Sequence, residues 1–315
     1  MFNAEKFIEK TVLKLKKEIN RKALIAFSGG VDSAVAAALA EKAIGNQLVA
    51  VHVDTGYMRK GESEKVKKMM EKLELNFRFI DASNDYYKSL KNIEDPEEKR
   101  KIIGNKFIRC FEKIAKDEKI EYLVQGTIAP DWIESGGELR DTIKSHHNVG
   151  GLPEDMELKL VEPLRDLYKD EVRKVARVLG LSISERQPFP GPGLAIRVIG
   201  EATLEKTEIV REACDIVEKE IERAVEKGLM EKPWQYFAVL IPIKTVGVQG
   251  DKRVYGYTIA VRAVQSVDAM TCKYSDISHE ILDNISTKIT NTLGDKINRI
   301  VYDITNKPPG TVEWE

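Results

Sequence analysis

The string Ser-Gly-Gly-Val-Asp-Ser at residues 28–33 stands between an apolar run at 23–27 and an alanine-rich stretch at 34–44. This order predicts a buried strand, a tight turn of small residues and a helix. Gly29 and Gly30 allow the backbone to approach an anion closely, and the free N–H groups at the start of the helix favour phosphate. The string therefore predicts a phosphate site. The alternative is a tight turn that only uses small residues.

The kind of phosphate site follows from what the string lacks. A Walker A loop needs a Gly-Lys pair before Ser or Thr, and a dinucleotide fingerprint needs three spaced glycines; neither follows this strand. The string instead resembles the PP-loop of the ATP pyrophosphatase superfamily. Its members split ATP between the α and β phosphates, so the resemblance implies that the turn binds the departing pyrophosphate. The residues concerned are Ser28, Gly29, Gly30, Val31, Asp32 and Ser33.

Composition excludes several classes of protein. A length of 315 residues favours two domains. Lys+Arg 50 against Asp+Glu 51 gives no overall basic field for nucleic acid. We expect no membrane span, since no apolar stretch is long enough, and no signal peptide at the charged N-terminus. Three cysteines without a C-x-x-C pair favour free thiols and a cytoplasmic location.

Strands alternate with helices in the first half of the chain. We expect strands at 23–27, 48–53, 77–80 and 122–125, and helices at 1–19, 34–44, 63–73, 96–118 and 170–179. Such alternation predicts an α/β fold with a parallel sheet. Ligands bind at the carboxyl ends of the strands of such sheets. With the PP-loop resemblance, this implies the adenine nucleotide alpha-hydrolase type of domain.

Glycine and proline punctuate the rest of the chain. We expect a long functional loop at 128–160 and place a domain boundary in the Pro/Gly segment at 187–193. The domains are then 1–190 and 191–315, the second a smaller α+β domain. There we expect helices at 204–227 and 277–293, strands at 237–246, 255–264 and 300–304, and a connector at 247–253.

Candidate ligand residues follow the predicted strands. Backbone groups near Val53 can recognise adenine, Arg59 can reach a phosphate or ribose, and Gly126 ends the fourth strand. Asp131 and Glu134 lie within one helical turn of each other and can hold Mg²⁺, which prefers oxygen ligands. The alternative for these carboxylates is a charged loop that faces water.

Residues 144–151 read Lys-Ser-His-His-Asn-Val-Gly-Gly. The glycines predict a hinged lid. Lys144 can neutralise charge that develops on the phosphates, and His146 or His147 can transfer a proton near neutral pH. One alternative is an inert loop. A zinc site is a further alternative, which the sequence favours much less because the side chains of adjacent histidines normally point apart.

The chain ends in Lys-Pro-Pro-Gly-Thr-Val-Glu-Trp-Glu at 307–315. Two prolines stiffen this tail, which predicts that it docks although termini are usually loose. Lys307 and Thr311 can bind a phosphate, and Glu313 can accept hydrogen bonds from a base. Considered alone, the tail would be interpreted as a packing device.

In this order the segments resemble the ATP-pyrophosphatase part of the GMP synthase family. The matches also include 99–104, 125–127, 144–153, 188–194 and 247–251. The resemblance implies that ATP, xanthosine 5′-monophosphate (XMP) and ammonia give AMP, pyrophosphate and GMP. It also implies a homodimer through the second domain. The XMP-contacting positions that it implies are Arg100, Gln249, Asp251, Lys307 and Glu313.

Most members of the family carry a glutaminase domain with a cysteine nucleophile in a Gly-flanked turn. Cys110, Cys214 and Cys272 lack that setting, so the resemblance implies a synthetase subunit that takes ammonia from a separate glutaminase or from solution. Two rivals stay open. They are another PP-loop ligase, such as a tRNA thiolase or an NAD synthetase, and a non-catalytic sensor of adenine nucleotides.

Overall fold

The computed structural model describes residues 2–129, 158–181, 187–266 and 270–315. The chain forms two compact units, each of which gathers separate stretches of sequence. The first unit contains residues 1–55, 61–82 and 103–185. The second contains residues 56–60, 83–102 and 186–315. We describe each unit by itself.

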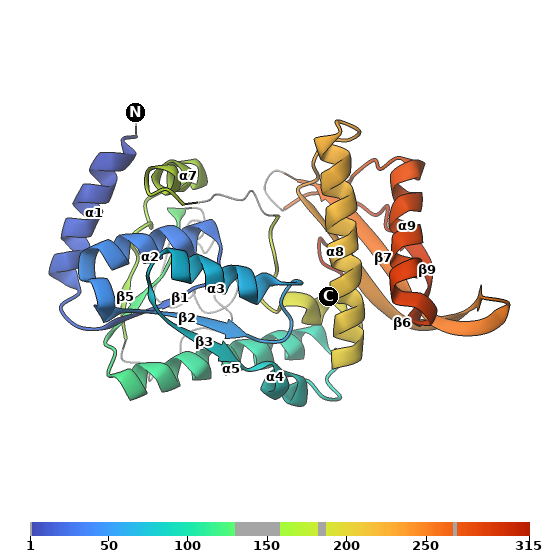
Figure 1. Ribbon diagram of the computed structural model, residues 1–315, viewed down its shortest axis with the longest axis horizontal. Helices are drawn as coiled ribbons and strands as arrows, with labels where there is room; N and C mark the ends of the chain where they lie inside the picture. Colours follow the sequence, from blue (N-terminus) through green and yellow to red (C-terminus); the bar gives the residue numbers. More distant parts are fainter. Residues whose placement is uncertain (1, 130–157, 182–186, 267–269) are drawn as a thin grey trace. The chain divides into compact units, whose positions relative to one another are not determined.

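A five-stranded parallel sheet forms the centre of the first unit, in the order β3-β2-β1-β4-β5 (Figure 1). Its strands are β1 (Ala23–Ala26), β2 (Leu48–Asp54), β3 (Asn76–Asp81), β4 (Tyr122–Val124) and β5 (Lys159–Val161). The first four strands, β1 to β4, lie where the sequence predicted strands. β5 overlaps the end of the loop predicted at 128–160, and the prediction is wrong at residues 159 and 160. Two of its three residues are exposed, so it gives no run of buried apolar residues.

Helices cover both faces of this sheet, with α2 on one side and the later part of α5 on the other (Figure 1). The helices are α1 (Ala4–Glu18), α2 (Val31–Ile44), α3 (Glu62–Lys72), α5 (Pro96–Glu118) and α7 (Lys169–Val178). Eight residues of α2 are buried, six of them alanines. Small side chains let this helix approach its neighbours closely, and α1, α2 and α7 contribute to one core cluster with the strands.

The strand order reverses between β1 and β4, which are neighbours in the sheet. β2 and β3 continue the sheet on one side, and β5 continues it on the other. The turn at 28–33 follows β1, and the turn at 125–127 follows β4. Both therefore lie at the switch point, where open parallel sheets bind their ligands.

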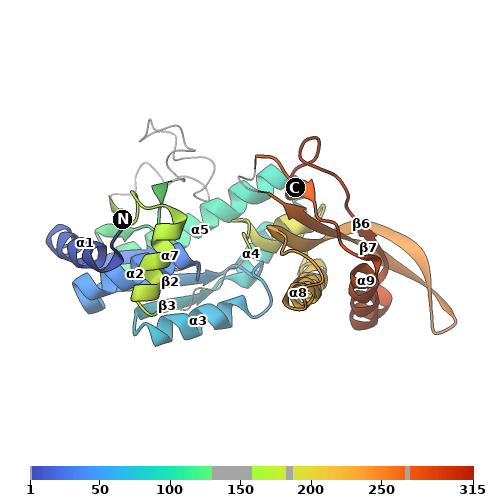
Figure 2. The ribbon, with the colours of Figure 1, turned by 90° about the horizontal axis from the view of Figure 1, so that it is seen from above.

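The second unit combines a mixed sheet with two long helices, α8 and α9, which pack against each other and the sheet (Figure 2). β7 pairs antiparallel with β6 and β8, and parallel with β9. The elements are α4 (Ser83–Ser89), α8 (Leu204–Glu226), β6 (Gln235–Gln249), β7 (Lys252–Gln265), β8 (Lys273–Tyr274), α9 (His279–Leu293) and β9 (Ile297–Tyr302).

β6 and β7 form a hairpin longer than the sequence predicted. The expected connector at 247–253 is mostly strand, and only Gly250 and Asp251 form the turn, both with positive φ of 51° and 62°. Polar and glycine residues made these strand ends look like a loop. No residue in the distal half of β6 is buried, and residues 242–244 are exposed in succession, which explains the weak apolar signal.

Two short segments, 56–60 and 83–102, belong to the second unit although the sequence placed them in the first domain. The Tyr57 hydroxyl donates to the Ala202 carbonyl at 3.0 Å, and the ring of Tyr57 lies 4.9 Å from that of Tyr87. Arg211 donates to the Met58 carbonyl at 2.9 Å. These contacts join residues that are far apart in sequence, so no local sequence pattern predicts them.

Among the residues that the structure describes, no helix is both long enough and apolar enough to span a bilayer.

Candidate active site

The turn at residues 28–33 is held by its own hydroxyl groups. The hydroxyls of Ser28 and Ser33 lie 3.0 Å apart, and the Gly30 N–H donates to the Ser28 Oγ at 3.3 Å. The Ser33 hydroxyl lies 3.0 Å from the Gly30 carbonyl. α2 begins at Val31, so its free N–H groups point out of this turn. The arrangement supplies both hydroxyl and backbone donors to an anion.

Two glycines lie where neighbouring atoms leave no room for a Cβ. Gly29 has φ of 77°, and a Cβ there would lie 2.6 Å from Cγ2 of Val66 on α3. A Cβ on Gly126 would lie 3.0 Å from the backbone carbon of Asp32. The structure thus brings Gly126 together with the turn, as the positions of β1 and β4 imply. Their part in binding a nucleotide stays a prediction.

Asp32, in the first turn of α2, has two unlike carboxylate oxygens. Lys169 at the start of α7 donates to Oδ2 at 2.5 Å. Oδ1 is buried and has no hydrogen-bond partner among the described residues. A buried acceptor without a partner is costly, and a divalent cation is one group that would satisfy it. Asp32 Oδ1 therefore suits one ligand position of a cation such as Mg²⁺.

From the sequence, the segment that contains Lys169 is expected to have a structural role that closes the first domain, and contact of Lys169 with a ligand is only the weaker alternative. The only local signal of Lys169 is its place at the start of a helix whose first turn carries Asp170 and Glu171. That pattern also occurs at helix starts with no ligand. The ion pair with Asp32 joins residues 137 positions apart, so only the fold could identify it.

Five predicted residues lie outside the described residues: Asp131, Glu134, Lys144, His146 and His147. Their roles in binding metal and in catalysis stay predictions. Within the described part of the chain, no group of three or more His, Cys, Asp or Glu side chains could hold a metal ion.

Val53 and Arg59 have different surroundings. Val53 is buried near the carboxyl end of β2, where its backbone lies at the predicted edge. The Arg59 guanidinium belongs to the second unit. There it donates to the carbonyls of Gln187 and Pro188, at 3.0 and 3.2 Å, and pairs with Glu218 at 3.4 Å. To reach a phosphate or ribose, Arg59 would have to exchange these partners.

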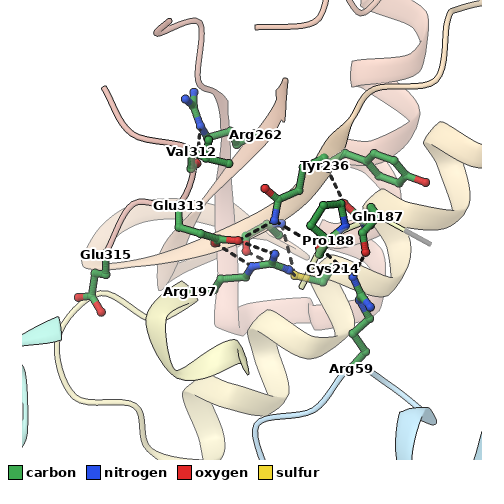
Figure 3. A network of polar contacts seen from close by, with 12 residues as sticks. Arg59, Gln187, Pro188, Arg197, Cys214, Tyr236, Arg262, Val312, Glu313 and Glu315 are labelled. Carbon is green, nitrogen blue, oxygen red and sulfur yellow. Dashed lines mark hydrogen bonds and ion pairs between the residues drawn. The ribbon is translucent and has the colours of Figure 1, made fainter. Parts of the chain in front are cut away.

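A buried arginine organises the tail in the second unit (Figure 3). Arg197 is fully buried and binds both carboxylate oxygens of Glu313, at 2.8 and 3.1 Å. Its guanidinium also lies over the Phe237 ring, 4.1 Å from the centroid. Burial acts to lower the pKa of Arg197, but the Glu313 carboxylate raises it above its ordinary value. Gln235 donates to the same carboxylate at 2.8 Å.

The last residue of the chain is held in a second buried pair. The Lys99 ammonium, on α5, donates to the Glu315 carboxylate and, at 2.8 Å, to the Val198 carbonyl. Burial lowers the pKa of Lys99 although Glu315 opposes this, and burial raises the pKa of Glu315 although Lys99 opposes that. Arg100 donates to the backbone oxygen of Glu315 at 2.6 Å. The tail therefore docks, as its two prolines predict.

Arg262 on β7 holds the middle of the tail. It donates to the carbonyls of Thr311 and Val312, at 2.6 and 2.8 Å, and to the Asp303 carboxylate at 2.8 Å. The Trp314 indole also donates to Asp303, at 2.9 Å. An open cavity of about 440 Å³ lies here, large enough for a small ligand. Its lining includes Arg262, Thr305, Gly310, Thr311 and Trp314.

The six predicted XMP residues fall into two groups. Lys307, Thr311 and Glu313 belong to the docked tail, and Arg100 contacts its last residue. Gln249 and Asp251 lie at the tip of the hairpin. Arg262, which anchors the tail, comes ten residues after the first residue of β7. At about 3.3 Å per residue, the two groups are on the order of 30 Å apart along the strand. One mononucleotide cannot contact both groups within a single chain.

Comparison with known proteins gives matches over the whole chain. The profile of the NAD synthase family matches residues 2–130, and that of the GMP synthase C terminal domain matches residues 222–314. A subunit of GMP synthase (glutamine-hydrolyzing) from Methanopyrus kandleri is 57% identical over 100% of both chains. The subunits of the same name from Thermoplasma acidophilum and Pyrococcus furiosus are 54% and 57% identical. They cover 98% and 99% of this chain, which covers 98% and 97% of theirs.

Among solved structures, an NMN synthetase from Francisella tularensis aligns over 93% of this chain and 95% of its own. The TM-score is 0.48 and the identity 14%, a likeness too remote to support an argument.

Proposed function

The chain belongs to the family of these GMP synthase (glutamine-hydrolyzing) subunits, and from this premise we propose how its residues serve the ATP-dependent conversion of XMP into GMP. The observation that carries the proposal is the turn at 28–33. It presents hydroxyl and backbone donors at the switch point of the parallel sheet, with Gly126 packed against Asp32. In our proposal this turn binds the β and γ phosphates of ATP.

The chemistry has two steps. The C2 oxygen of XMP attacks the α phosphorus of ATP, the bond to the β-phosphate oxygen breaks, and pyrophosphate leaves. Ammonia then attacks C2, the C2–oxygen bond breaks, and AMP leaves with the former C2 oxygen. The free backbone N–H groups at the start of α2 stabilise the negative charge that develops on pyrophosphate in the first step. The hydroxyls of Ser28 and Ser33 join them when they exchange their partners within the turn for phosphate oxygens.

Asp32 and Lys169 extend the phosphate site. The ammonium of Lys169 forms an ion pair with the Asp32 carboxylate. After a short movement of its flexible side chain, it can neutralise the charge of a phosphate oxygen. The unsatisfied Oδ1 of Asp32 suits Mg²⁺, together with the predicted ligands Asp131 and Glu134. When bound, Mg²⁺ would supply positive charge to the leaving pyrophosphate.

We assign XMP to the docked tail. Three hydrogen bonds, two from Arg197 and one from Gln235, occupy the Glu313 carboxylate. A carboxylate accepts about four, so one acceptor position is left for an N–H of the purine base. Arg100 and Lys307 supply positive charge for the phosphate group. Thr311 adds its hydroxyl when it exchanges the Glu313 carbonyl for a phosphate oxygen.

A second copy of the chain would complete this site. The distance between the hairpin tip and the tail supports an arrangement in which Gln249 and Asp251 serve the partner's tail. The distal hairpin also exposes apolar side chains, which include Val248, Tyr255 and Ile243. A two-fold dimer through this arm would bury them and bring each tip to the other subunit.

Ammonia would come from a separate glutaminase, since the relatives are named as one subunit of a glutamine-hydrolyzing enzyme. We propose a cytoplasmic location, which the three free cysteines support.

The test supplies the chain with XMP, ATP and ammonium, and measures every product. We expect GMP, AMP and pyrophosphate in equal amounts. Ser33→Ala should lower kcat/KM for ATP by at least ~10-fold, since a donor to the developing charge is lost. Ser89→Ala, which removes an exposed hydroxyl from α4, is the matched control. ADP and orthophosphate as products, or normal kinetics in Ser33→Ala, would overturn the proposal.

A further inference from the structure

A buried histidine lies directly behind the turn at 28–33. His52 on β2 is only 3% exposed, and its ring lies 5.7 Å from that of Phe79. Neither the sequence analysis nor the chemistry above gives it a task. Its neighbours in β2 are apolar residues that simply fill the core. A polar ring at this position requires partners, because burial without them is costly.

Each ring nitrogen of His52 has a partner. Nδ1 lies 3.0 Å from the carbonyl oxygen of Phe27, and Nε2 lies 3.3 Å from the Ser63 hydroxyl. The Ser63 hydroxyl lies 2.7 Å from Oδ2 of Asp54. A carbonyl only accepts, so Nδ1 carries a hydrogen. These contacts form a continuous relay from the backbone of Phe27 to the side chain of Asp54.

Both ends of the relay lie at the candidate site. Phe27 is followed directly by Ser28, so its carbonyl belongs to the peptide that carries the Ser28 N–H. Asp54 ends β2 at the ligand edge of the sheet. Ser63 stands in the first turn of α3, and Val66 on the same helix is the residue that a Cβ on Gly29 would strike. The same helix, α3, therefore contacts the turn through Val66 and completes the relay through Ser63.

We propose that His52 is a positioning residue for the pyrophosphate-binding turn. Its Nδ1–H fixes the orientation of the Phe27–Ser28 peptide, and Ser63 joins this peptide to Asp54. The first donors of the turn are then aimed before ATP arrives. This inference rests on the proposed placement of pyrophosphate at residues 28–33.

Substitution of His52 by Asn or Gln can test the contributions of its two ring nitrogens separately. The amide nitrogen of Asn can stand where Nδ1 is, and that of Gln can stand where Nε2 is. His52→Asn therefore keeps the donor to Phe27, and His52→Gln keeps the contact with Ser63. His52→Phe keeps the apolar packing and removes both. Phe79→Leu is the control, because it changes the packing against His52 and leaves the relay intact.

The experiment measures GMP formation with ammonium, with ATP and XMP varied separately. His52→Phe should lower kcat/KM for ATP by about 10–100-fold, as expected for misplaced binding groups, with the KM for XMP unchanged. His52→Asn should recover most of this loss, and His52→Gln should not. Ser63→Ala should give a smaller loss than His52→Phe, and it remains informative if His52→Phe fails to fold.

Two results overturn the inference in different ways. If all three His52 variants and Ser63→Ala keep normal kcat/KM for ATP and only their thermal midpoints fall, His52 is a packing residue and the pyrophosphate site stands. If Ser33→Ala also has normal ATP kinetics, the proposed placement of pyrophosphate fails, and the role of His52 fails with it.

Discussion

The turn at 28–33 and the docked tail differ in how their polar groups are satisfied. The turn is built from small residues, and its donors are a few hydroxyls and backbone N–H groups within six positions. The tail is held by side chains from distant segments. The ion pairs are those of Arg197 with Glu313, Arg262 with Asp303, and Lys99 with Glu315. The start of α2, which follows the turn, leaves backbone N–H donors available for a ligand, whereas most charges of the tail are paired within its own structure.

This difference indicates how each region would fail. A change in the turn should affect the chemistry more than the stability, because the turn carries little of the core. A change in the tail network should affect stability first, because it leaves a buried charge without its partner. Substitutions in the two regions can test this contrast.

The largest effect is expected for Arg197→Met. It leaves the Glu313 carboxylate facing a buried space without its cation, which should lower the free energy of unfolding by about 3–5 kcal/mol. Urea unfolding followed by circular dichroism measures this. Arg109→Met, which removes an exposed arginine paired with Glu112, should leave the midpoint unchanged. Equal midpoints for both variants would show that the network does not hold the tail.

A smaller effect, mostly on catalysis, is expected for Gly29→Ala. A Cβ there meets Val66 at 2.6 Å and needs positive φ, so the turn must shift. We expect kcat/KM for ATP to fall by about 10²-fold. Gly45→Ala also changes a glycine with positive φ, at the other end of α2, and meets no atom within 4 Å. Gly45→Ala should strain the backbone at that position and leave kcat/KM for ATP unchanged. The same activity in both variants would contradict the assignment of the turn.

The division of the XMP residues allows a mixing experiment. Gln249→Ala and Thr311→Ala should each raise the KM for XMP, by about 10-fold. If the tip serves the partner subunit, a mixed dimer contains one site with both residues intact. Dimers re-formed from equal amounts of the two variants should then recover about a quarter of the wild-type sites. No recovery, although mixed dimers form, would place both residues in the same chain's site.

The smallest effects concern pH. Hydrogen bonds from Thr305 and the charge of Arg262 outweigh burial and lower the pKa of Asp303, so its contribution is present above the ordinary Asp pKa and lost as pH falls through the folded value. Burial raises the pKa of Glu218 despite Arg59 and Arg197, so the folded state favours its protonated form and stability falls as pH rises.

Unfolding free energies between about pH 3 and pH 6 test both directions, since this range contains the ordinary values of Asp and Glu. Asp303→Asn should flatten the decline on the acid side, and Glu218→Gln should flatten the decline toward neutral pH. Variants whose pH profiles keep the shape of the wild-type profile would show that these carboxyls do not titrate with folding.

The central strands, the long helices and the phosphate-binding turn could be predicted because their signals are local. The apolar run at 23–27 precedes the turn, and α5 runs from Pro96 to Glu118 as its pattern predicted. β5 and the distal part of the hairpin were missed because their residues are mostly exposed and lack a regular apolar pattern. The ion pair of Lys169 with Asp32 and the contacts of His52 were not predicted because the partners are distant in sequence.

By itself the sequence determined the alternation that makes a parallel sheet, the small residues that let a turn approach an anion, and the family. The tertiary structure decided which charges meet. It joined Arg197 to Glu313, Lys169 to Asp32 and His52 to Phe27, and it separated Gln249 from the tail. The physical reason is range: strand and turn preferences act between neighbours in sequence, whereas a buried charge is stabilised by whichever group the fold brings within hydrogen-bond distance.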